Sequence, residues 1–553
     1  MLLTGGQILL ECLKEQGVET IFGYPGGAVL PIYDAIYDSD IRHILVRHEQ
    51  AAAHAADGYA RASGKVGVCL ATSGPGATNL VTGIANAAMD SVPMVAFTGQ
   101  VPTTLLGRDS FQEADITGIT MPITKHNYLV RDIADLGRIV KEAFFIASTG
   151  RPGPVLVDIP RDISAGTFDY HSYEHPVRLP GYNPKLTANP RLVAEAIQAI
   201  AQARRPVIYA GGGVINAGAS EELRQLAEAI MAPVTTTLMG LGCFPGDHAL
   251  SLGMLGMHGA KYANYAVYEC DLLIGIGVRF DDRVTGKIES FAPEARIIHI
   301  DIDPAEMGKN VPAHIAIAGD VKYVLRQLLD GLMANPNPAW AEKIKEWKRE
   351  YPLTFAQGKG LKPQYVIRRI SEICGERARI CTEVGQNQMW TAQHYTFTRP
   401  RSFISSGGLG TMGFGLPAAI GVQVACPGEI VFDIAGDGSI QMNIQELTTA
   451  VNYELPVNVA ILNNACLGMV RQWQELFYNR RYSHTELKNP DFCRVAEAFG
   501  AEAIKVTKEL EVRPAIEQAV KSSRPVVMDF CVEQEENVMP MVPPGEAINK
   551  MLG

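Results

Sequence analysis

The chain has 553 residues, more than one hydrophobic core usually organises, so we expect three or four domains. Apolar residues make up 47% and charged residues 20%, which is a globular composition. The 49 basic and 59 acidic residues leave a formal charge of -10, which argues against nucleic-acid binding.

Apolar stretches end before the roughly 18 residues that a transmembrane helix needs, and the first residues show neither a basic region nor a small-residue cleavage site. We therefore expect a cytoplasmic protein without membrane spans. The ten cysteines form no Cys-x-x-Cys pair, so neither a zinc site nor a thioredoxin-like motif is indicated, and reduced buried thiols are expected.

The first 165 residues alternate helical and strand patterns. Thr4 and Gln7 form a capping box that predicts the start of a helix, and Gly17 predicts its end. Strands are predicted at 18–23, 41–46, 66–72 and 92–98, with helices over 50–61 and 79–89 between them. This order of βαβ units predicts a parallel sheet with helices on both faces.

Two segments lack hydrophobic periodicity and are interpreted as linkers, 166–190 and 334–363. They divide the chain into a first domain over 1–165, a middle domain over 191–333, a third domain over 364–535 and a tail over 536–553. Strand patterns at 206–210, 272–276 and 297–302 indicate that the middle domain is also α/β. The predicted fold is three doubly wound parallel-sheet domains, the middle one Rossmann-like.

An internal repeat joins residues 66–99 to residues 429–464. Each has an apolar strand, a Gly-x-Gly turn, a helix, a proline and a second strand. We interpret the first and third domains as copies of one unit. The copies differ in the turn, which carries Pro75 in the first and Asp437, a residue able to bind a cation, in the second.

The third-domain turn, Gly-Asp-Gly-Ser at 436–439, follows a strand and opens a helix, where free backbone amides suit a phosphate. Asn463 and Asn464 end the next strand, and the carboxyl ends of neighbouring parallel strands lie together. Asp437 and Asn464 could therefore offer oxygen ligands to one Mg²⁺ ion. Alone, such a turn is more often structural than functional.

Two further features indicate a ligand site. Glu49 ends a predicted strand and begins an alanine-rich helix, so its carboxylate either meets a ligand or only complements the helix N-terminus. The run SGGLGTMG at 406–413 has too many glycines for a helix interior and would let the backbone approach a ligand closely.

The Gly-Asp-Gly turn followed by Asn463 and Asn464 resembles the diphosphate-binding signature of thiamine-diphosphate enzymes. Nearly the whole chain resembles the catalytic large subunit of acetohydroxyacid synthase, also called acetolactate synthase. The segments that carry this resemblance are FGYPGGA (22–28), RHEQ (47–50), SGPGATN (73–79), FQE (111–113), TKHNYLV (124–130), GRPGPVLVDIPRD (150–162), LGMHG (255–259), RFDDRVTG (279–286), GMVRQWQ (468–474) and MVPPG (541–545).

The resemblance implies thiamine diphosphate and Mg²⁺ as cofactors. It implies catalytic roles for Glu49, Gly26 and Gln112, with Glu49 hydrogen-bonding the pyrimidine N1′ and starting the proton relay to the thiazolium C2. It places the metal on Asp437, Asn464 and the backbone carbonyl of Cys466. Together with Glu49, the residues implied around thiamine diphosphate are Val384, Gly385, Gln386, Asn387, Gly410, Met412, Gly438, Ser439, Asn464, Leu467, Gly468 and Met469.

Met412, Asn387 and Arg161 differ from the other positions in how the resemblance applies to them. The resemblance puts Met412 under the cofactor and gives the Gly410 carbonyl a ring hydrogen bond, whereas core packing is the alternative for Met412. Asn387 stands where the family commonly has histidine. Arg161 stands where the family often has lysine, which keeps the charge and changes its geometry.

The middle domain is similar to the flavin-binding domain of the same family, which implies FAD as a mainly structural cofactor. The residues implied to contact it are Arg151, Gly211, Gly212, Thr237, Leu238, Met257, His258, Gly259, Arg279, Asp281, Asp301 and Asp320. From the residues alone, the glycines at 211–213 are a weak nucleotide signal, and 279–283 could be a solvated run of charges.

For substrate, the resemblance implies Phe111, Gln112, Arg283 and Trp473. Arg283 would meet the carboxylate of a 2-keto acid, and Trp473 would favour the larger ethyl group of 2-ketobutyrate. The alternatives are an ion pair of Arg283 with Asp281 or Asp282 and burial of Trp473 in an apolar helical stripe.

The implied reaction decarboxylates pyruvate and transfers the two-carbon unit to a second pyruvate, giving 2-acetolactate, or to 2-ketobutyrate, giving 2-aceto-2-hydroxybutyrate, in branched-chain amino acid biosynthesis. The family's site lies between two chains, which implies a homodimer or homotetramer, and a small regulatory subunit is a further partner that the family allows. A flavin-linked pyruvate oxidase or a glyoxylate carboligase shares the layout, although Glu49 weighs against the carboligase. The alternative from another class is an inactive nucleotide-binding or regulatory protein.

Overall fold

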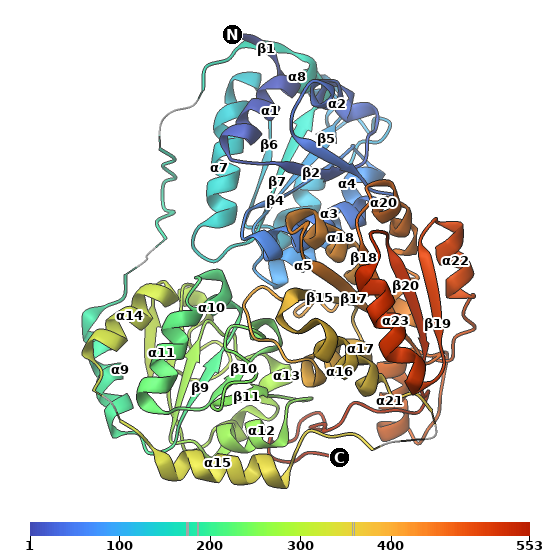
Figure 1. The fold of residues 1–553 in the computed structure, drawn as a ribbon. Helices are drawn as coiled ribbons and strands as arrows, with labels where there is room; N and C mark the ends of the chain where they lie inside the picture. The colour runs from blue at the N-terminus through green and yellow to red at the C-terminus, as the bar shows by residue number, and fades with distance from the viewer. Residues whose placement is uncertain (173–175, 185–186, 334, 357, 359) are drawn as a thin grey trace.

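The computed structural model describes residues 1–172, 176–184, 187–333, 335–356, 358 and 360–553. Three α/β domains follow one another along the chain, at the top, lower left and lower right of Figure 1. Each has a six-stranded, wholly parallel sheet, which confirms the predicted fold class. No helix in the described part of the chain has both the length and the apolar character that a membrane span requires.

The first domain contains the strands β2 (Thr20–Gly23), β3 (Arg42–Leu45), β4 (Gly67–Ala71), β5 (Met94–Gln100), β6 (His126–Leu129) and β7 (Pro154–Pro160). Its helices are α1 (Gly5–Glu15), α2 (Leu30–Tyr37), α3 (Glu49–Ser63), α4 (Pro75–Asn79), α5 (Val81–Met89), α6 (Ile116–Thr120), α7 (Leu136–Ser148) and α8 (Arg161–Ala165). The predicted capping box is present, since Thr4 and Gln7 hydrogen-bond each other's backbone at the start of α1. A short antiparallel pair, β1 (Leu2–Thr4) with β8 (Thr167–Asp169), closes the domain.

The middle domain contains β9 (Pro206–Ala210), β10 (Val234–Thr236), β11 (Ser251–Met254), β12 (Leu272–Ile276), β13 (Arg296–Asp301) and β14 (Ile315–Ala318). Its helices are α9 (Pro190–Gln202), α10 (Gly212–Asn216), α11 (Ser220–Ile230), α12 (Lys261–Glu269), α13 (Asp282–Thr285), α14 (Val321–Gly331) and α15 (Pro338–Glu350).

The third domain contains β15 (Ala378–Thr382), β16 (Phe403–Ser405), β17 (Ile430–Gly436), β18 (Val457–Asn463), β19 (Glu502–Val506) and β20 (Val526–Cys531). Its helices are α16 (Pro363–Cys374), α17 (Gln386–His394), α18 (Gly415–Ala425), α19 (Asp437–Ile440), α20 (Leu447–Asn452), α21 (Gly468–Phe477), α22 (Phe492–Ala498) and α23 (Glu509–Lys521).

Strand order identifies the repeated unit. The first sheet runs β3-β2-β4-β5-β7-β6 and the third runs β16-β15-β17-β18-β20-β19, so the two share one topology. The middle sheet runs β11-β10-β9-β12-β13-β14, which is the order of dinucleotide-binding sheets. Ligand sites in such sheets lie where the strand order reverses, beyond the carboxyl ends of the strands.

One segment differs from its prediction. The stretch 334–363 was interpreted as a linker, yet it contains helix α15, whose Trp340 and Ile344 are buried against the middle domain. The indole of Trp340 also donates a hydrogen bond to the carbonyl of Pro206. Because prolines flank this short amphipathic helix, the sequence pattern did not predict it. The residues 173–175, 185–186, 334, 357 and 359 of the two predicted linkers lie outside the described residues.

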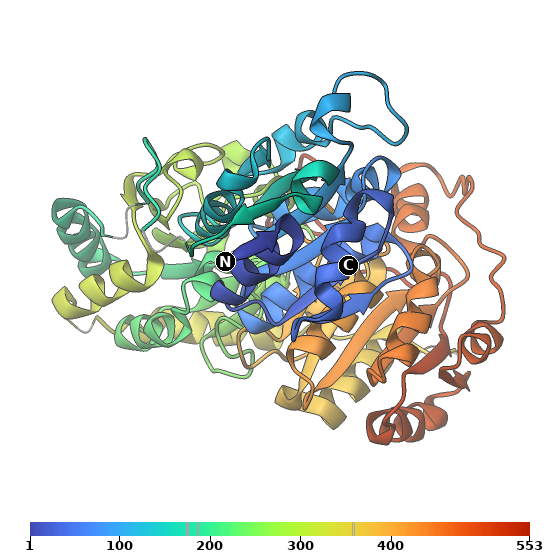
Figure 2. The ribbon, with the colours of Figure 1, turned by 90° about the horizontal axis from the view of Figure 1, so that it is seen from above.

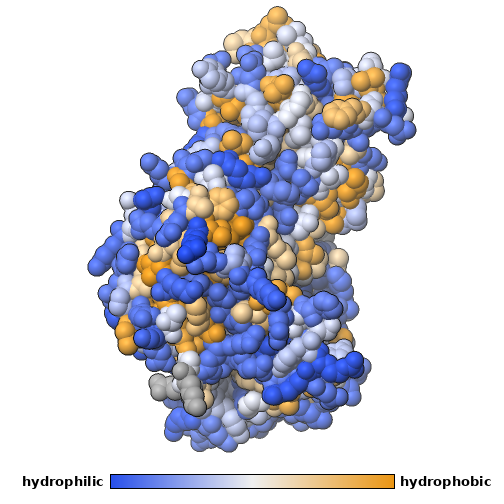
Figure 3. Space-filling view, turned by 90° about the vertical axis from the view of Figure 1, so that its right-hand side faces the viewer, coloured by the Kyte–Doolittle hydropathy of each residue, from blue (hydrophilic) through white to orange (hydrophobic). Residues whose placement is uncertain are grey.

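Viewed from above, the light-blue segment between β5 and β6 projects from the first domain (Figure 2). The face drawn in Figure 3 is mainly hydrophilic and carries separate apolar patches. The C-terminal tail returns from the third domain to the middle one, where the amide of Val542 donates to the carbonyl of Met257.

The first and third domains meet where α3 lies against α18. A Cβ on Gly58 would lie 2.2 Å from the carbonyl oxygen of Ala418, and one on Gly421 would lie 1.9 Å from that of Ala55. Only glycine at these two positions lets the helix backbones come so close. The contact therefore depends on two residues without side chains.

Gly421→Ala should lower the midpoint of thermal unfolding, because its Cβ would overlap the backbone of α3. Overpacking of this kind costs about 1–3 kcal/mol. Circular dichroism measures the midpoint, and Gly428→Ala is the matched control because its Cβ would meet nothing within 4 Å. Equal midpoints for the two variants would contradict the close contact.

Candidate active site

The first domain gathers predicted catalytic residues around the turn that follows β4. A Cβ on Gly26 would lie 2.5 Å from the side chain of Thr72, and one on Gly76 would lie 3.3 Å from Oε1 of Glu49. Asn79 donates a hydrogen bond of 2.9 Å to Oε2 of Glu49. Glu49 is thus the first residue of α3 and also lies beside this turn.

Gln112 reaches the same turn from the projecting segment. Its Cβ lies 2.9 Å from the position that a Cβ on Gly74 would take, and its own backbone has a φ of 59°. The neighbouring Phe111 is 89% exposed in the single chain. Gly26, Glu49 and Gln112 therefore lie together, whereas the Phe111 side chain is left largely open to solvent.

The third domain supports the backbone that leads into Glu49. The amide of Arg47 donates to both carboxylate oxygens of Glu446, at 2.9 and 3.2 Å, and Thr449 donates to the same carboxylate at 2.6 Å. Burial raises the pKa of Glu446 to about 7, although these hydrogen bonds oppose the rise.

The predicted metal ligands also lie together. Asp437 begins the short helix α19 after β17, and the backbone amide of Ala465, next to Asn464, lies close enough to its carboxylate to lower its pKa. Asn489 donates to Oδ2 of Asp437 at 2.6 Å and to Oδ1 of Asn463 at 3.1 Å. Burial raises the pKa of Asp437 to about 6, so a bound cation would favour its ionised form.

Oxygen atoms alone make up the expected donor set: one carboxylate, one amide and the carbonyl of Cys466. That chemistry fits Mg²⁺. The described residues contain no group of three or more His, Cys, Asp and Glu side chains placed for a metal. Two of the expected donors are a side-chain amide and a backbone carbonyl, so the proposed Mg²⁺ site has too few His, Cys, Asp or Glu side chains to count as such a group.

Two residues expected near the diphosphate use their side chains within the protein. Asn387 donates to the carbonyls of Glu383 and Ile434, at 3.0 and 2.8 Å, and so joins the ends of β15 and β17. Gln386 accepts from Asn464 at 3.2 Å and donates to the carbonyl of Glu536 at 2.9 Å. A contact with a diphosphate would therefore come from the backbone here.

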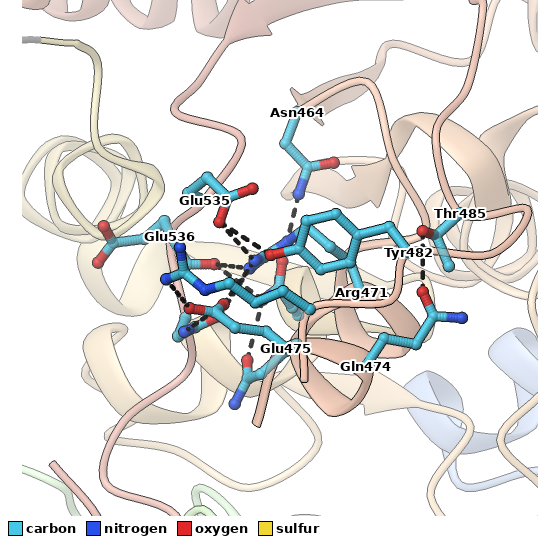
Figure 4. Close-up of polar contacts among 12 residues, drawn as sticks. Asn464, Arg471, Gln474, Glu475, Tyr482, Thr485, Glu535 and Glu536 are labelled. Atoms are coloured by element: carbon cyan, nitrogen blue, oxygen red, sulfur yellow. Dashed lines mark hydrogen bonds and ion pairs between the residues drawn. The ribbon is translucent and has the colours of Figure 1, made fainter. Parts of the chain in front are cut away.

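A buried arginine extends this network to the tail. Arg471, only 2% exposed, lies among Glu475, Glu535 and Glu536 in Figure 4. Its guanidinium is 2.7 Å from Glu475 and 3.4 Å from Glu535, and it donates to the carbonyl of Glu536 at 2.9 Å. The tail is thus connected to the metal-ligand turn through Arg471, Gln386 and Asn464.

Met412 is half-buried and lies beside the Gly-Asp-Gly turn. Its Cε is 3.8 Å from the position of a Cβ on Gly438, and the Cδ2 of Leu467 is 2.8 Å from the same position. Ser439 keeps its hydroxyl for the backbone of Gly436. Met412 is therefore at the edge of the predicted site, not inside the core.

A cavity of about 1160 Å³ opens where the three domains meet. Of the residues implied to contact a flavin, all except Gly211 and Gly259 line it. Val384, Gly385, Gly410 and Met469 line it from the third domain, but Glu49 does not. Its volume is that of a site for a large organic ligand.

The lining of this cavity contains polar atoms that have no hydrogen-bond partner among the described residues. They are Oη of Tyr209, Oγ1 of Thr237 and Nδ1 of His258. A buried polar atom without a hydrogen-bond partner costs free energy of desolvation, and a bound ligand removes this cost when it supplies the partner. The cavity therefore fits a large cofactor with many polar atoms, as FAD is.

Arg283 of the middle domain and Trp473 of the third domain both line this cavity. Arg283 is 63% exposed, and its nearest carboxylate is Asp282 at 3.8 Å, so it is not held in a close ion pair. Trp473 lies on the cavity wall with its ring 5.4 Å from that of Phe477. The ion-pair alternative for Arg283 is thus present as a long, exposed pair with Asp282, whereas Trp473 is half-buried and not completely buried.

Asn489 and Tyr209 were not identified from the sequence. Asn489 lies 52 positions from Asp437 in a segment without a motif, so no local pattern marks it. Tyr209 occupies a strand position where an aromatic residue is expected in any sheet. Tyr209 stands near the carboxyl end of β9, where ligand sites of parallel sheets lie, and this position was the one feature of the sequence that could have indicated it.

Comparisons with known proteins agree with this organisation. Family models match three segments: thiamine pyrophosphate enzyme, N-terminal TPP binding domain (residues 3–119), central domain (193–328) and C-terminal TPP binding domain (383–530). The chain is 53% identical to a probable acetolactate synthase large subunit of Methanocaldococcus jannaschii, covering 100% of this chain and 95% of that protein. It is 54% identical to the acetolactate synthase large subunit of Parasynechococcus marenigrum, covering 100% and 91%. The corresponding protein of Corynebacterium glutamicum is 51% identical, over 99% and 89%.

Glu446→Gln should stabilise the chain more at about pH 8 than at about pH 5, relative to the unaltered chain. The raised pKa of Glu446 means that the unfolded chain releases this proton first as pH rises. Its contribution to stability is therefore greatest at low pH and declines from the ordinary glutamate pKa up to about 7, by about 3 kcal/mol. Thermal midpoints of both proteins at the two pH values test this, and a difference that does not change with pH would contradict it.

Proposed function

The chain belongs to the family of acetolactate synthase large subunits among the thiamine pyrophosphate enzymes, and from that premise we propose that it decarboxylates pyruvate and transfers the two-carbon unit to a second 2-keto acid. The products are 2-acetolactate from pyruvate and 2-aceto-2-hydroxybutyrate from 2-ketobutyrate. The observation that carries the proposal is a pair of residue groups, here called half-sites, at equivalent ends of the first and third sheets, which share one topology. One holds Glu49, and the other holds Asp437 beside Asn464.

Thiamine diphosphate, when bound, supplies the electron sink that loss of carbon dioxide from a 2-keto acid requires. The chain's task is to bind and orient it. Asp437, Asn464 and the Cys466 carbonyl would hold Mg²⁺ against the diphosphate, and Glu49 would exchange a proton with N1′ of the pyrimidine ring. Asn79 holds one oxygen of Glu49, which fixes the carboxylate for that exchange.

We propose that each active site is completed by two chains. The cavity that collects third-domain residues is not lined by Glu49, Gly26 or Gln112 of the same chain. Large apolar side chains beside both half-sites are exposed in the single chain, including Phe111 at 89%, Met442 at 54% and Leu409 at 42%. Exposed apolar groups of this kind are typical of an interaction surface. A homodimer or homotetramer would cover them.

FAD is proposed for the large cavity, where Thr237 and His258 present unpartnered polar atoms and Arg151 is held by Glu306 at 2.7 Å. Arg283 and Trp473 border the same cavity. We propose that Arg283 binds the carboxylate of the second 2-keto acid and that Trp473 packs against its alkyl group. Both residues have the chemistry and the exposure that this requires.

The relatives are named large subunits, and a small regulatory subunit is proposed as a partner of this chain too. All ten cysteines are free thiols in the structure, which supports a cytoplasmic location because reducing compartments keep thiols unpaired.

Glu49→Gln should lower the rate of acetolactate formation from pyruvate by about 10²- to 10⁴-fold, because the amide cannot exchange the proton that the carboxylate carries. Product formation is measured with purified protein, and thiamine diphosphate, Mg²⁺ and FAD are each omitted in turn. Glu11→Gln, a change in an exposed carboxylate of α1, is the matched control and should keep full activity.

Loss of acetolactate without thiamine diphosphate or Mg²⁺ would support the proposal. Acetaldehyde or acetate as the main product would contradict the proposed acceptor chemistry. Undiminished activity of Glu49→Gln would contradict the role of this carboxylate.

A further inference from the structure

The glycine-rich loop 406–413 is held by a carboxylate from the other domain. Asp90 directly follows α5 in the first domain, and it accepts hydrogen bonds from the amides of Gly407 at 3.0 Å and Gly408 at 2.7 Å. A Cβ on Gly408 would lie 2.9 Å from Oδ1 of Asp90. The loop therefore needs glycine at 408 in order to reach this carboxylate.

Asp90 belongs to a buried ion cluster. Arg61 donates to Oδ2 of Asp90 at 2.9 Å and to Asp57 at 2.5 Å, and both carboxylates are fully buried. Burial of two carboxylates with one guanidinium is stable only when further donors complete the geometry. The amides of Gly407 and Gly408 are two of those donors, so the cluster and the loop stabilise each other.

Asn86, within α5, binds two further residues of the loop. Asn86 donates to Asp57 at 3.0 Å and accepts from the hydroxyls of Ser406 at 2.5 Å and Thr411 at 3.3 Å. The amide of Thr411 donates to the Ser406 hydroxyl at 2.8 Å. These contacts bend the loop into a closed turn against the first domain.

The far end of the loop is held from its own domain. Glu383, directly after β15, accepts from the amide of Gly413 at 2.7 Å. Between the two carboxylate anchors, Gly410 lines the large cavity and Met412 lies beside Gly438. Ser406 and Gly407, which the anchors hold, line the same cavity, so the anchored part of the loop and Gly410 together form one edge of it.

Helix α3 carries both the acid expected to meet the cofactor and two members of the buried ion cluster. Glu49 is its first residue, and Asp57 and Arg61 lie further along it. Glu49 and Arg61 are separated by roughly 18 Å at the rise of an α-helix. In a site made by two chains, one end of α3 serves the partner's cofactor and the other end holds the loop of its own chain.

We propose that Asp90 is a positioning residue, which with Arg61 fixes the glycine-rich loop so that the Gly410 carbonyl and Met412 are aligned for the cofactor. This inference rests on the proposed function, because the loop matters to catalysis only if thiamine diphosphate lies against it. The first domain then has two tasks: supplying Glu49 to one site and setting the loop of another.

The test compares Asp90→Asn with Gly408→Ala and Glu429→Gln. Asp90→Asn keeps the size of the side chain but removes its charge, and Gly408→Ala pushes the loop away from Asp90 without altering a buried charge. Glu429 is the matched control, because its ion pair with Arg379 at 2.9 Å is also largely buried but does not touch the loop. For each protein, calorimetry gives the Kd of thiamine diphosphate with Mg²⁺, and kinetics give kcat and KM for pyruvate.

Both loop variants should weaken thiamine diphosphate binding and lower kcat by about 10- to 100-fold, with KM for pyruvate changed less than about twofold, since misplacement of about 1 Å has effects of this size. Glu429→Gln should change only the thermal midpoint. If the loop variants keep the Kd and kcat of the unaltered protein, or if Glu429→Gln loses as much, the inference is wrong.

The two proposals fail in different ways. If the unaltered protein binds thiamine diphosphate but makes no acetolactate, the proposed function is wrong and the Kd comparison still decides the role of Asp90. If the unaltered protein does not bind thiamine diphosphate at all, both proposals are overturned. If Asp90→Asn does not fold, Gly408→Ala decides alone.

Discussion

The backbone contact between α3 and α18 is the constraint on which the rest of the site depends. Gly58 and Gly421 let these helices approach until main-chain atoms touch. Glu49 begins α3, and the glycine-rich loop runs directly into α18. A shift of α3 against α18 would therefore change the position of Glu49 relative to the glycine-rich loop, and both half-sites would be affected.

Parallel sheets explain why the candidate residues could be found. The ends of neighbouring strands meet at one edge, so Asp437 after β17 and Asn464 after β18 were expected to lie together, and they do. Glu49 follows β3, which is separated from β4 by β2, so its place beside the turn that contains Gly76 is seen only in the structure. The shared strand order of the first and third sheets was indicated in the sequence by the internal repeat. The repeat and the pairing of Asp437 with Asn464 rest on local pattern and on one topological rule, whereas the roles of the individual site residues rest on the resemblance to acetohydroxyacid synthase.

The remaining contacts depend on packing between distant segments. Asp90 and Gly407 are 317 positions apart, and Asn86 and Ser406 are 320 apart. No period or motif relates such residues, because their meeting is set by how whole domains dock. Asn387 shows a subtler limit: its family position was recognised, but only the structure shows its amide joining the ends of β15 and β17.

The most direct test of a site shared between chains is complementation. Glu49→Gln and Asp437→Ala are each produced alone and then co-expressed, and the specific activity of acetolactate formation is measured. A hybrid dimer would contain one site with both native residues, so random pairing should restore about a quarter of the native activity. Activity of the mixture no higher than that of the separate variants would contradict the account, because Glu49 and Asp437 would then act within a single chain.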